Sequence, residues 1–199
     1  RVLAAAGIEY AVLGAQERCT GDSARRSGNE YLFAELAAAN VETLNRVAPR
    51  RIVTTCPHCL HTLKNEYPAF GGTYEVVHHT QLIQELYATG RLQAAPMEPL
   101  TGVAFHDPCY LGRQNGVFEA PRQALRQAGA SAAELPRHGA TSFCCGAGGA
   151  QMWKEEEQGD GRVSDERLRE AASAGASTLA TGCPFCMIML TDAAASAGG

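Results

Sequence analysis

Apolar residues recur near helical spacing in the first quarter of the chain, at Phe33, Leu36, Leu44 and Val47. Residues at this spacing share one side of a helix, so we expect an amphipathic helix with that side in the core. Ser164 is predicted to begin a second amphipathic helix, because serine suits a helix N-cap and the next two residues are acidic.

Short apolar runs rich in β-branched residues predict buried strands at Ile52 to Thr55, Tyr74 to Val77 and Val103 to Phe105. The segment Thr73 to Arg91 is expected to form a strand followed by a helix. Strands that alternate with helices are typical of parallel α/β units, in which ligand sites lie beyond the carboxyl ends of the strands. The sequence therefore predicts an α/β fold with short parallel sheets and flanking helices.

The chain contains an internal repeat, which the cysteines mark most clearly. In the first copy Cys19-Thr20-Gly21 is followed by Cys56-Pro57-His58-Cys59, and 36 residues separate Cys19 from Cys56. In the second copy Cys144-Cys145-Gly146 is followed by Cys183-Pro184-Phe185-Cys186, with 38 residues between Cys144 and Cys183. Proline suits the first turn of a helix, so each Cys-Pro-x-Cys motif is predicted to lie where a strand gives way to a helix.

The repeat divides the chain into two similar domains, 1–98 and 99–199, joined by a linker at Gln93 to Pro99 that carries two prolines. The second copy has a further cysteine, Cys109, which lies 20 positions before Gly129. Counting the same 20 positions back from Gly7, the equivalent residue in the first copy, leads to a point about 13 residues upstream of Arg1. We therefore expect this chain to be a fragment whose first copy has its leading cysteine upstream.

The composition is that of a globular domain, with 45% hydrophobic and 19% charged residues in 199. A formal net charge of -4 and a pI near 5.9 argue against binding to nucleic acid through phosphate attraction. The apolar runs are also far shorter than the roughly 18 residues that a transmembrane helix needs. These features predict a soluble protein without a nucleic-acid groove.

Eight clustered cysteines are the main chemical signal, at positions 19, 56, 59, 109, 144, 145, 183 and 186. Buried core thiols explain such clustering poorly. Structural zinc takes four ligands, whereas the second copy alone has five cysteines. Thiol-disulfide exchange at Cys56 and Cys59 would be similar to oxidising thioredoxin-fold enzymes, but it leaves Cys19, Cys109, Cys144 and Cys145 without a role. Iron-sulfur ligation uses all eight, and it is the preferred interpretation among these alternatives.

Glycines near the cysteines agree with cluster binding. Gly21, Gly146, Gly148 and Gly149 allow close approach of the backbone and can turn N-H groups toward an anionic cluster. A phosphate loop is the weaker interpretation, because the run lacks the glycine pattern of nucleotide-binding loops. These four glycines are therefore predicted to contribute to the cofactor sites.

The cysteine spacing and the residues around the cysteines resemble a known family. Cys109 is followed after 34 residues by Cys144, and 37 residues separate Cys145 from Cys183. With the segments His106 to Arg113 and Phe143 to Gly149, this pattern is similar to the cysteine-rich CCG domain of the B-type component of heterodisulfide reductase. The same pattern occurs in the glycolate oxidase iron-sulfur subunit and in lactate-utilisation proteins. It also occurs in large iron-sulfur-binding reductases that have an upstream membrane anchor and a ferredoxin-like segment.

The resemblance implies two tandem domains that transfer electrons through iron-sulfur clusters, and in some relatives an opened, non-cubane cluster held by five cysteines. In the second copy those five are Cys109, Cys144, Cys145, Cys183 and Cys186. Thr20 stands where Cys145 stands, so the first copy offers only Cys19, Cys56, Cys59 and the expected upstream cysteine, a set that suits a [4Fe-4S] cubane. We expect the first site to relay electrons and the second, with Cys144 and Cys145 as catalytic residues, to act on the substrate.

Neighbouring polar residues complete the predicted second site. His106 and Asp107 are candidates to orient Cys109 or to form a merely structural pair, and Arg113 is expected to offset cluster charge. By resemblance, the redox partner is a ferredoxin-like segment or a flavoprotein, and the substrate is a disulfide, a quinone or a 2-hydroxy acid system. We expect a cytoplasmic location, with membrane association only through upstream segments.

Overall fold

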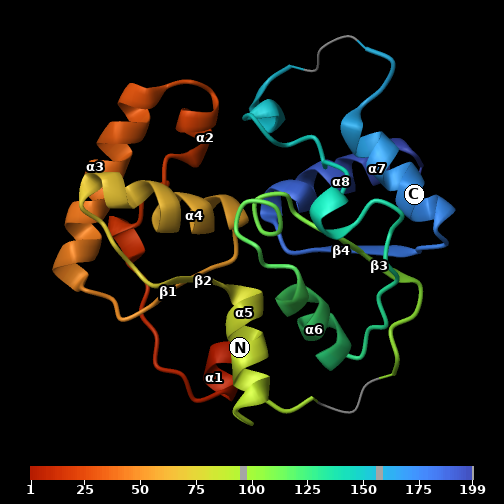
Figure 1. Ribbon diagram of the computed structural model, residues 1–199, viewed down its shortest axis with the longest axis horizontal. Coiled ribbons are helices and arrows are strands. Elements are labelled where there is room, and N and C mark those ends of the chain that lie inside the picture. The colour runs from red at the N-terminus through yellow and green to blue at the C-terminus, as the bar shows by residue number, and fades with distance from the viewer. Residues whose placement is uncertain (95–97, 156–158, 199) are drawn as a thin grey trace. The chain divides into compact units, whose positions relative to one another are not determined.

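The computed structural model describes residues 1–94, 98–155 and 159–198 of the chain. The chain divides into two compact units, Arg1–Ala94 and Ala95–Gly199. Each unit contains a parallel pair of strands with helices around it, which confirms the predicted α/β class (Figure 1). The predicted domain boundary at residue 98 stays a prediction, and residues 95–97 of the predicted linker lie outside the described residues.

The first unit is built around the parallel strands β1 and β2. Within its described residues the elements are α1 (Val2–Ala5), a 3-10 turn (Gly14–Gln16), α2 (Asp22–Arg26), α3 (Glu30–Val47), β1 (Ile52–Thr54), α4 (Pro57–His61), a π-helical turn (Thr62–Glu66), a 3-10 turn (Tyr67–Phe70), β2 (Val76–His78) and α5 (His79–Ala88).

Helix α3 confirms the amphipathic helix predicted from the apolar spacing. Its N-cap is Asn29, whose side-chain oxygen accepts a hydrogen bond from the backbone N-H of Leu32 at 3.1 Å. The buried side carries Phe33 and Leu44, as expected. Val47 was expected on the same side, but it is 49% exposed because the helix ends beside it in a left-handed C-cap.

The second unit is built around the parallel strands β3 and β4. Its described elements are β3 (Val103–His106), α6 (Glu119–Gln127), 3-10 turns (Gly139–Thr141 and Gln151–Trp153), α7 (Val163–Ser173), β4 (Thr178–Thr181) and α8 (Pro184–Ser196). Every residue of β3 is buried, and His106 at its carboxyl end pairs in register with Thr181. Ala104 packs with Leu135 and Ala171 in the core of this unit.

The predicted start of the second amphipathic helix was wrong by two residues. Helix α7 begins at Val163 with Arg162 as its N-cap, so Ser164 lies inside the first turn, where its side chain is buried. Arg162 forms an ion pair with Asp192 of α8 at 2.7 Å, which fixes the chain just before the helix. The acidic residues Asp165 and Glu166 nevertheless remain in the first turn, as the prediction required.

Both Cys-Pro-x-Cys motifs lie where a strand gives way to a helix, as predicted. Strand β1 ends at Thr54, and Cys56 is the N-cap of α4. Strand β4 ends at Thr181, and Cys183 is the N-cap of α8. The prolines that follow occupy the first helical turn, where the missing N-H has no intrahelical partner to lose.

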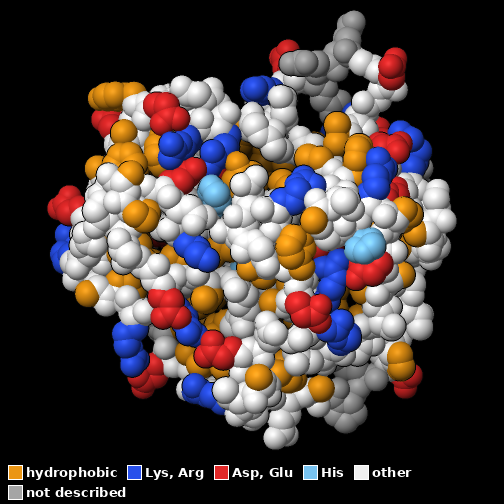
Figure 2. Space-filling model, viewed as in Figure 1, with side chains coloured by type: hydrophobic (Ala, Val, Ile, Leu, Met, Phe, Trp, Pro, Cys, Tyr) orange, Lys and Arg blue, Asp and Glu red, His pale blue; other side chains and the backbone are white. Residues whose placement is uncertain are grey.

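Charged side chains of both signs are interspersed on the face of the molecule in Figure 2. Arg51 is typical, since it lies 2.6 Å from Glu75 and 2.8 Å from Glu85. Exposed pairs of this kind contribute about 1 kcal/mol or less to stability. In the described part of the chain no helix has the length and apolar character that crossing a membrane requires.

Candidate metal centre

Five thiols of the second unit form one continuous chain of contacts. Hydrogen bonds link Cys109 to Cys144, Cys144 to Cys145, Cys145 to Cys186, and Cys186 to Cys183. These residues come from the turn after β3, the loop before α7 and the first turn of α8. Within the described part of the chain, none of the five forms a disulfide. Segments that are far apart in sequence therefore bring the five thiols into a chain of pairwise contacts.

The electrostatics of this cluster favour a bound cation. Cys144 accepts hydrogen bonds from Cys109 and Cys145, and these hold its pKa far below the ordinary value. The pKa values of Cys109, Cys145 and Cys186 are raised, first because each donates to a neighbouring sulfur and then because of burial. Adjacent thiolates repel one another, so the five cannot all ionise unless positive charge is placed among them.

The five thiols differ in burial. Cys145, Cys183 and Cys186 are each 3% exposed, whereas Cys109 and Cys144 are only partly buried. Access from solvent to the sulfur cluster is therefore greater at Cys109 and Cys144.

Arg113 acts on the thiols through its charge, whereas Asp107 supports the loop that carries two of them. The guanidinium of Arg113 donates to the backbone oxygen of Ser142 at 2.5 Å, and its charge opposes the rise in the pKa of Cys109. Asp107 is held by Arg122 at 2.7 and 2.8 Å, and its backbone oxygen accepts from Ser142. Asp107 thus anchors the loop that leads to Cys144 and Cys145.

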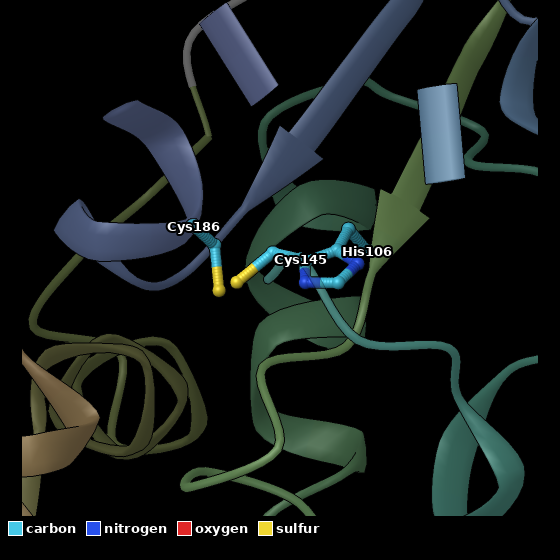
Figure 3. Close-up of side chains that lie close together, drawn as sticks. All are labelled: His106, Cys145 and Cys186. Atoms are coloured by element: carbon cyan, nitrogen blue, oxygen red, sulfur yellow. The ribbon is translucent and has the colours of Figure 1, made fainter. Parts of the chain in front are cut away.

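His106 contacts different cysteines from the one that sequence proximity indicated. A ring nitrogen of His106 and the sulfur atoms of Cys145 and Cys186 all lie within 4.8 Å of one another. In Figure 3 the two sulfur atoms lie side by side, and the imidazole lies beside the Cys145 side chain. Burial and then the charge of Arg167 lower the pKa of His106 to about 4, so the ring is neutral at physiological pH. Sequence reasoning missed this placement, which depends on the end of β3.

The first unit brings its three cysteines into a smaller arrangement of the same kind. A hydrogen bond links Cys59 to Cys56 and, with burial, raises the pKa of Cys59 well above its ordinary value. Thr20 donates to the Cys59 sulfur at 3.5 Å, and the backbone N-H of Gly21 donates to the Cys19 sulfur at 3.4 Å. Thr20 therefore occupies the position of Cys145 in the second unit, where the hydrogen bond runs the other way, from Cys186 to Cys145.

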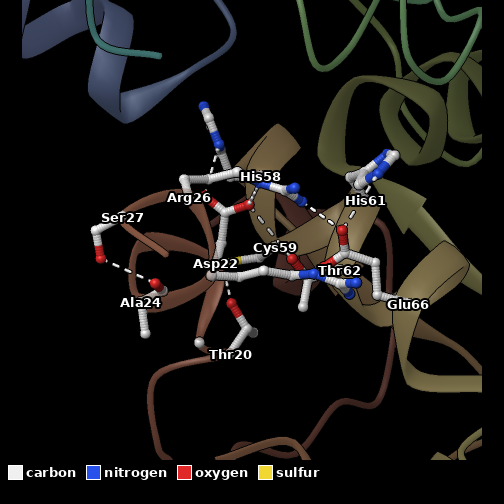
Figure 4. A network of polar contacts seen from close by, with 12 residues as sticks. Thr20, Asp22, Ala24, Arg26, Ser27, His58, Cys59, His61, Thr62 and Glu66 are labelled. Carbon is white, nitrogen blue, oxygen red and sulfur yellow. Dashed lines mark hydrogen bonds and ion pairs between the residues drawn. The ribbon is translucent and has the colours of Figure 1, made fainter. Parts of the chain in front are cut away.

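A buried polar network in the first unit was not predicted from the sequence (Figure 4). Asp22 contacts His58 at 2.8 Å and Arg26 at 3.0 Å, and Arg26 also contacts Glu66. Burial raises the pKa of Asp22, but the hydrogen bond from His58 and the contact with Arg26 outweigh it and leave the pKa below its ordinary value. The network ties α2 to the Cys-Pro-His-Cys turn and so fixes both cysteine loops.

The four predicted glycines differ in backbone conformation and in their contacts with sulfur. Gly21 and Gly146 adopt positive φ angles of 86° and 90°, and each donates its N-H to the sulfur two residues before it, at 3.4 and 3.2 Å. A side chain at Gly21 would lie 2.9 Å from the Phe33 ring. At Gly148 and Gly149 an added side chain would meet open space, but the φ angle of 67° at Gly149 still favours glycine.

The residues present fit an iron-sulfur group. Five linked thiols exceed the four ligands of a tetrahedral zinc ion, and multi-iron clusters are held by thiolates. The Nε2 atom of His106 is buried without a hydrogen-bond partner among the described residues, which indicates that a further group belongs beside it.

The family of this chain follows from its match to the model of the cysteine-rich domain CCG over residues 1–64 and 103–191. The chain belongs to the CCG cysteine-rich domain family. The resemblance drawn from the cysteine spacing is thereby confirmed, and both halves of the repeat fall within the match.

Several curated proteins are similar to this chain. EtfAB:quinone oxidoreductase of Syntrophomonas wolfei is 43% identical over 199 residues, which cover 96% of this chain and 28% of that protein. The probable iron-sulfur-binding oxidoreductase FadF of Bacillus subtilis is 43% identical over 194 residues, covering 96% and 27%. One subunit of the dihydromethanophenazine:CoB--CoM heterodisulfide reductase of Methanosarcina barkeri is 33% identical, covering 96% and 48%. The chain thus spans less than half the length of these relatives.

Proposed function

We propose that this chain is the electron-transferring part of an iron-sulfur oxidoreductase, with one cluster site in each unit. The observation that carries the proposal is the continuous contact of five thiols in the second unit. The names of the relatives, which include oxidoreductases and an iron-sulfur-binding protein, support the same chemistry.

In this proposal Cys109, Cys144, Cys145, Cys183 and Cys186 hold the second cluster, which is non-cubane. The first site uses Cys19, Cys56 and Cys59 with a cysteine upstream of the chain and holds a [4Fe-4S] cubane. A cluster supplies one-electron transfer at a potential that charge, hydrogen bonds and solvent exposure set.

The protein's own groups would orient and tune the two sites. The N-H groups of Gly21 and Gly146 donate to cysteine sulfur, and the charge of Arg113 lies near Cys109. Substrate would approach the second site at the less buried thiol Cys144, with Cys145 behind it. Such donors and positive charges stabilise the more negative, reduced form of a cluster.

We assign the partners and substrates by chemical class. The electron donor or acceptor would be a ferredoxin-like segment or a flavoprotein, and the substrate a quinone, a disulfide or a 2-hydroxy acid system. The names of two relatives support the quinone and disulfide classes. We further propose a cytoplasmic location, with any membrane association supplied by other segments of the longer protein.

The test is purification of the full chain without oxygen, followed by measurement of iron, acid-labile sulfide and zinc. We expect a brown protein that contains iron and sulfide. Stoichiometric zinc without sulfide would overturn the proposal in favour of a structural zinc module. Rapid reduction of insulin disulfides by the metal-free chain would instead support thiol-disulfide exchange at Cys56 and Cys59.

A further inference from the structure

His106 of the second unit is held by a buried arginine. Arg167 is 0% exposed, and its Nε donates a hydrogen bond to the Nδ1 atom of His106 at 3.0 Å. The same guanidinium donates to the backbone oxygen of Arg137 at 2.9 Å and to Glu170 at 2.8 Å. These three bonds fix the direction of the Nε-H group, so His106 meets a fixed donor.

This contact selects one tautomer of the imidazole. Arginine can only donate, so the Nδ1 atom of His106 must accept, and the proton of the neutral ring must lie on Nε2. The reverse tautomer would place two N-H groups against each other inside the core. Arg167 therefore makes His106 an N-H donor on the side of the ring away from the guanidinium.

The Nε2-H group of His106 is buried and needs a hydrogen-bond acceptor. Its Nε2 atom has no hydrogen-bond partner among the described residues, and an unsatisfied buried donor costs roughly 1–3 kcal/mol. Because Nδ1 is engaged by Arg167, Nε2 is the ring nitrogen available to the sulfur atoms of Cys145 and Cys186, which lie within 4.8 Å (Figure 3).

Other buried donors that lack a partner within the described ranges lie close to the same place. Thr181 pairs in register with His106, and its hydroxyl is unsatisfied. The Ser164 hydroxyl is also unsatisfied, and the Ser164 backbone nitrogen is 3.6 Å from the position of a Cβ at Gly146. Nη2 of Arg167 is a further donor of this kind. Such a collection of donors suits an acceptor-rich, negatively charged group between the strand ends and the Gly146 loop.

We propose that His106 is a hydrogen-bond donor to sulfur in the second site and not a metal ligand, and that Arg167 is the positioning residue that sets its tautomer. The inference rests on the proposed function, since it needs a cluster at the five cysteines. A protonated Nε2 has no lone pair for a metal, and ligation would require the ring to lose that proton or to turn its N-H toward Arg167. An N-H donor to sulfur stabilises the reduced cluster and so raises its reduction potential.

The test uses pulsed EPR on the full chain, purified anaerobically with its clusters and with 15N-labelled histidine, in H2O and in D2O. For wild type we expect weak nitrogen coupling and an exchangeable proton close to the second cluster. The His106→Leu variant should lose this proton signal and show a lower reduction potential. The His106→Gln variant retains an N-H donor at a similar position and should recover most of both.

Two further variants complete the design. Arg167→Met has a similar length but no donor, so the tautomer is no longer fixed and the proton coupling should weaken. His138→Leu is the matched control, because His138 is an exposed histidine of the same unit that bonds the Leu135 backbone oxygen. It should leave the spectrum and the potential unchanged.

The outcomes separate the inference from the proposed function. Strong nitrogen coupling in wild type would identify His106 as a ligand and overturn the inference. An unchanged potential and proton signal in a cluster-loaded His106→Leu variant would overturn it as well. If that variant fails to bind clusters, the wild-type spectra and the His106→Gln variant still decide. Absence of iron and sulfide from wild type would refute the proposed function itself.

Discussion

Thr20 donates a hydrogen bond to the sulfur atom of Cys59 at 3.5 Å. In the second unit the corresponding contact joins two cysteines, Cys145 and Cys186. One position of the repeat thus supplies a hydroxyl donor in the first unit and a thiol in the second. This difference, together with Cys109, separates a site with three thiols in the chain from a site with five.

Replacing Thr20 by Val should weaken metal binding at the first site. Loss of a hydrogen bond beside a ligand typically lowers metal affinity by about 10-fold or more. The measurement is the rate at which iron from this site is transferred to a chelator, followed by EPR. Thr20→Ser keeps the hydroxyl and should behave as wild type, and equal rates for both variants would contradict the role of the hydrogen bond.

Replacing Cys145 by Ser should change the second site alone. The variant removes the thiol that joins Cys144 to Cys186, so the EPR spectrum of the second cluster should change while that of the first stays the same. Cys145→Thr copies the first unit and should give a cubane-like spectrum. A wild-type spectrum for both variants would exclude ligation by five thiolates.

Replacing Gly146 by Ala should destabilise the second unit. The φ angle of Gly146 is 90°, and an added Cβ would lie 3.3 Å from Val163. Placing a non-glycine residue in this conformation costs about 1–3 kcal/mol. Urea unfolding of the variant measures the loss. Gly148→Ala is the control, since a side chain there meets open space, and it should change stability by less than about 0.5 kcal/mol.

Replacing Arg122 by Leu should destabilise the second unit by about 3 kcal/mol, because it leaves the buried carboxylate of Asp107 without its cationic partner. The free energy of unfolding in urea checks this value. Arg126→Gln lies on the same helix, α6, but removes only an exposed ion pair with Glu119, and it should cost less than about 1 kcal/mol. Similar losses for the two variants would show that burial of the pair is unimportant.

Asp22 should make the stability of the first unit depend on acid pH. Its pKa is below the ordinary value of 3.8, so the folded state favours the carboxylate. Relative to Asp22→Asn, wild type should be more stable by about 2 kcal/mol at pH 7. This advantage should persist above pH 3.8 and disappear as the pH falls through the lower pKa of the folded state.

The comparison requires urea unfolding from pH 7 to pH 3 with both proteins in the same metal state. Glu30→Gln alters an exposed carboxylate near Arg25 and should show no such pH dependence. A stability difference for Asp22→Asn that stays constant down to pH 3 would exclude the carboxylate as its source.

Local signals in the sequence were sufficient to predict much of the fold. The proline after Cys56 or Cys183 and the strands before them depend on nearest neighbours, so the strand-to-helix transitions could be predicted. The start of α7 was not predicted: its N-cap is Arg162, which forms an ion pair with Asp192, a residue 30 positions away. Local capping preference pointed to Ser164 instead.

The candidate site was predictable where cysteines mark it and not where it depends on distant polar partners. The repeat and the spacing of its cysteines were sufficient to group the thiols into two sets. His106 and Arg167 are 61 residues apart, and Asp22 and His58 are 36 apart. Neither pair has a local motif, because a hydrogen bond across the core leaves no periodic pattern in the chain.

Helix α8 runs without interruption from Pro184 to Ser196, and Cys183 caps its first turn. The peptide dipoles of such a helix add up to roughly half a positive charge at this end. The backbone itself therefore lowers the energy of negative charge beside Cys183 and Cys186. In the first unit, α4 spans only Pro57–His61 before the backbone changes to π-helical geometry. The two cysteine sites therefore offer an arriving electron unequal electrostatic surroundings.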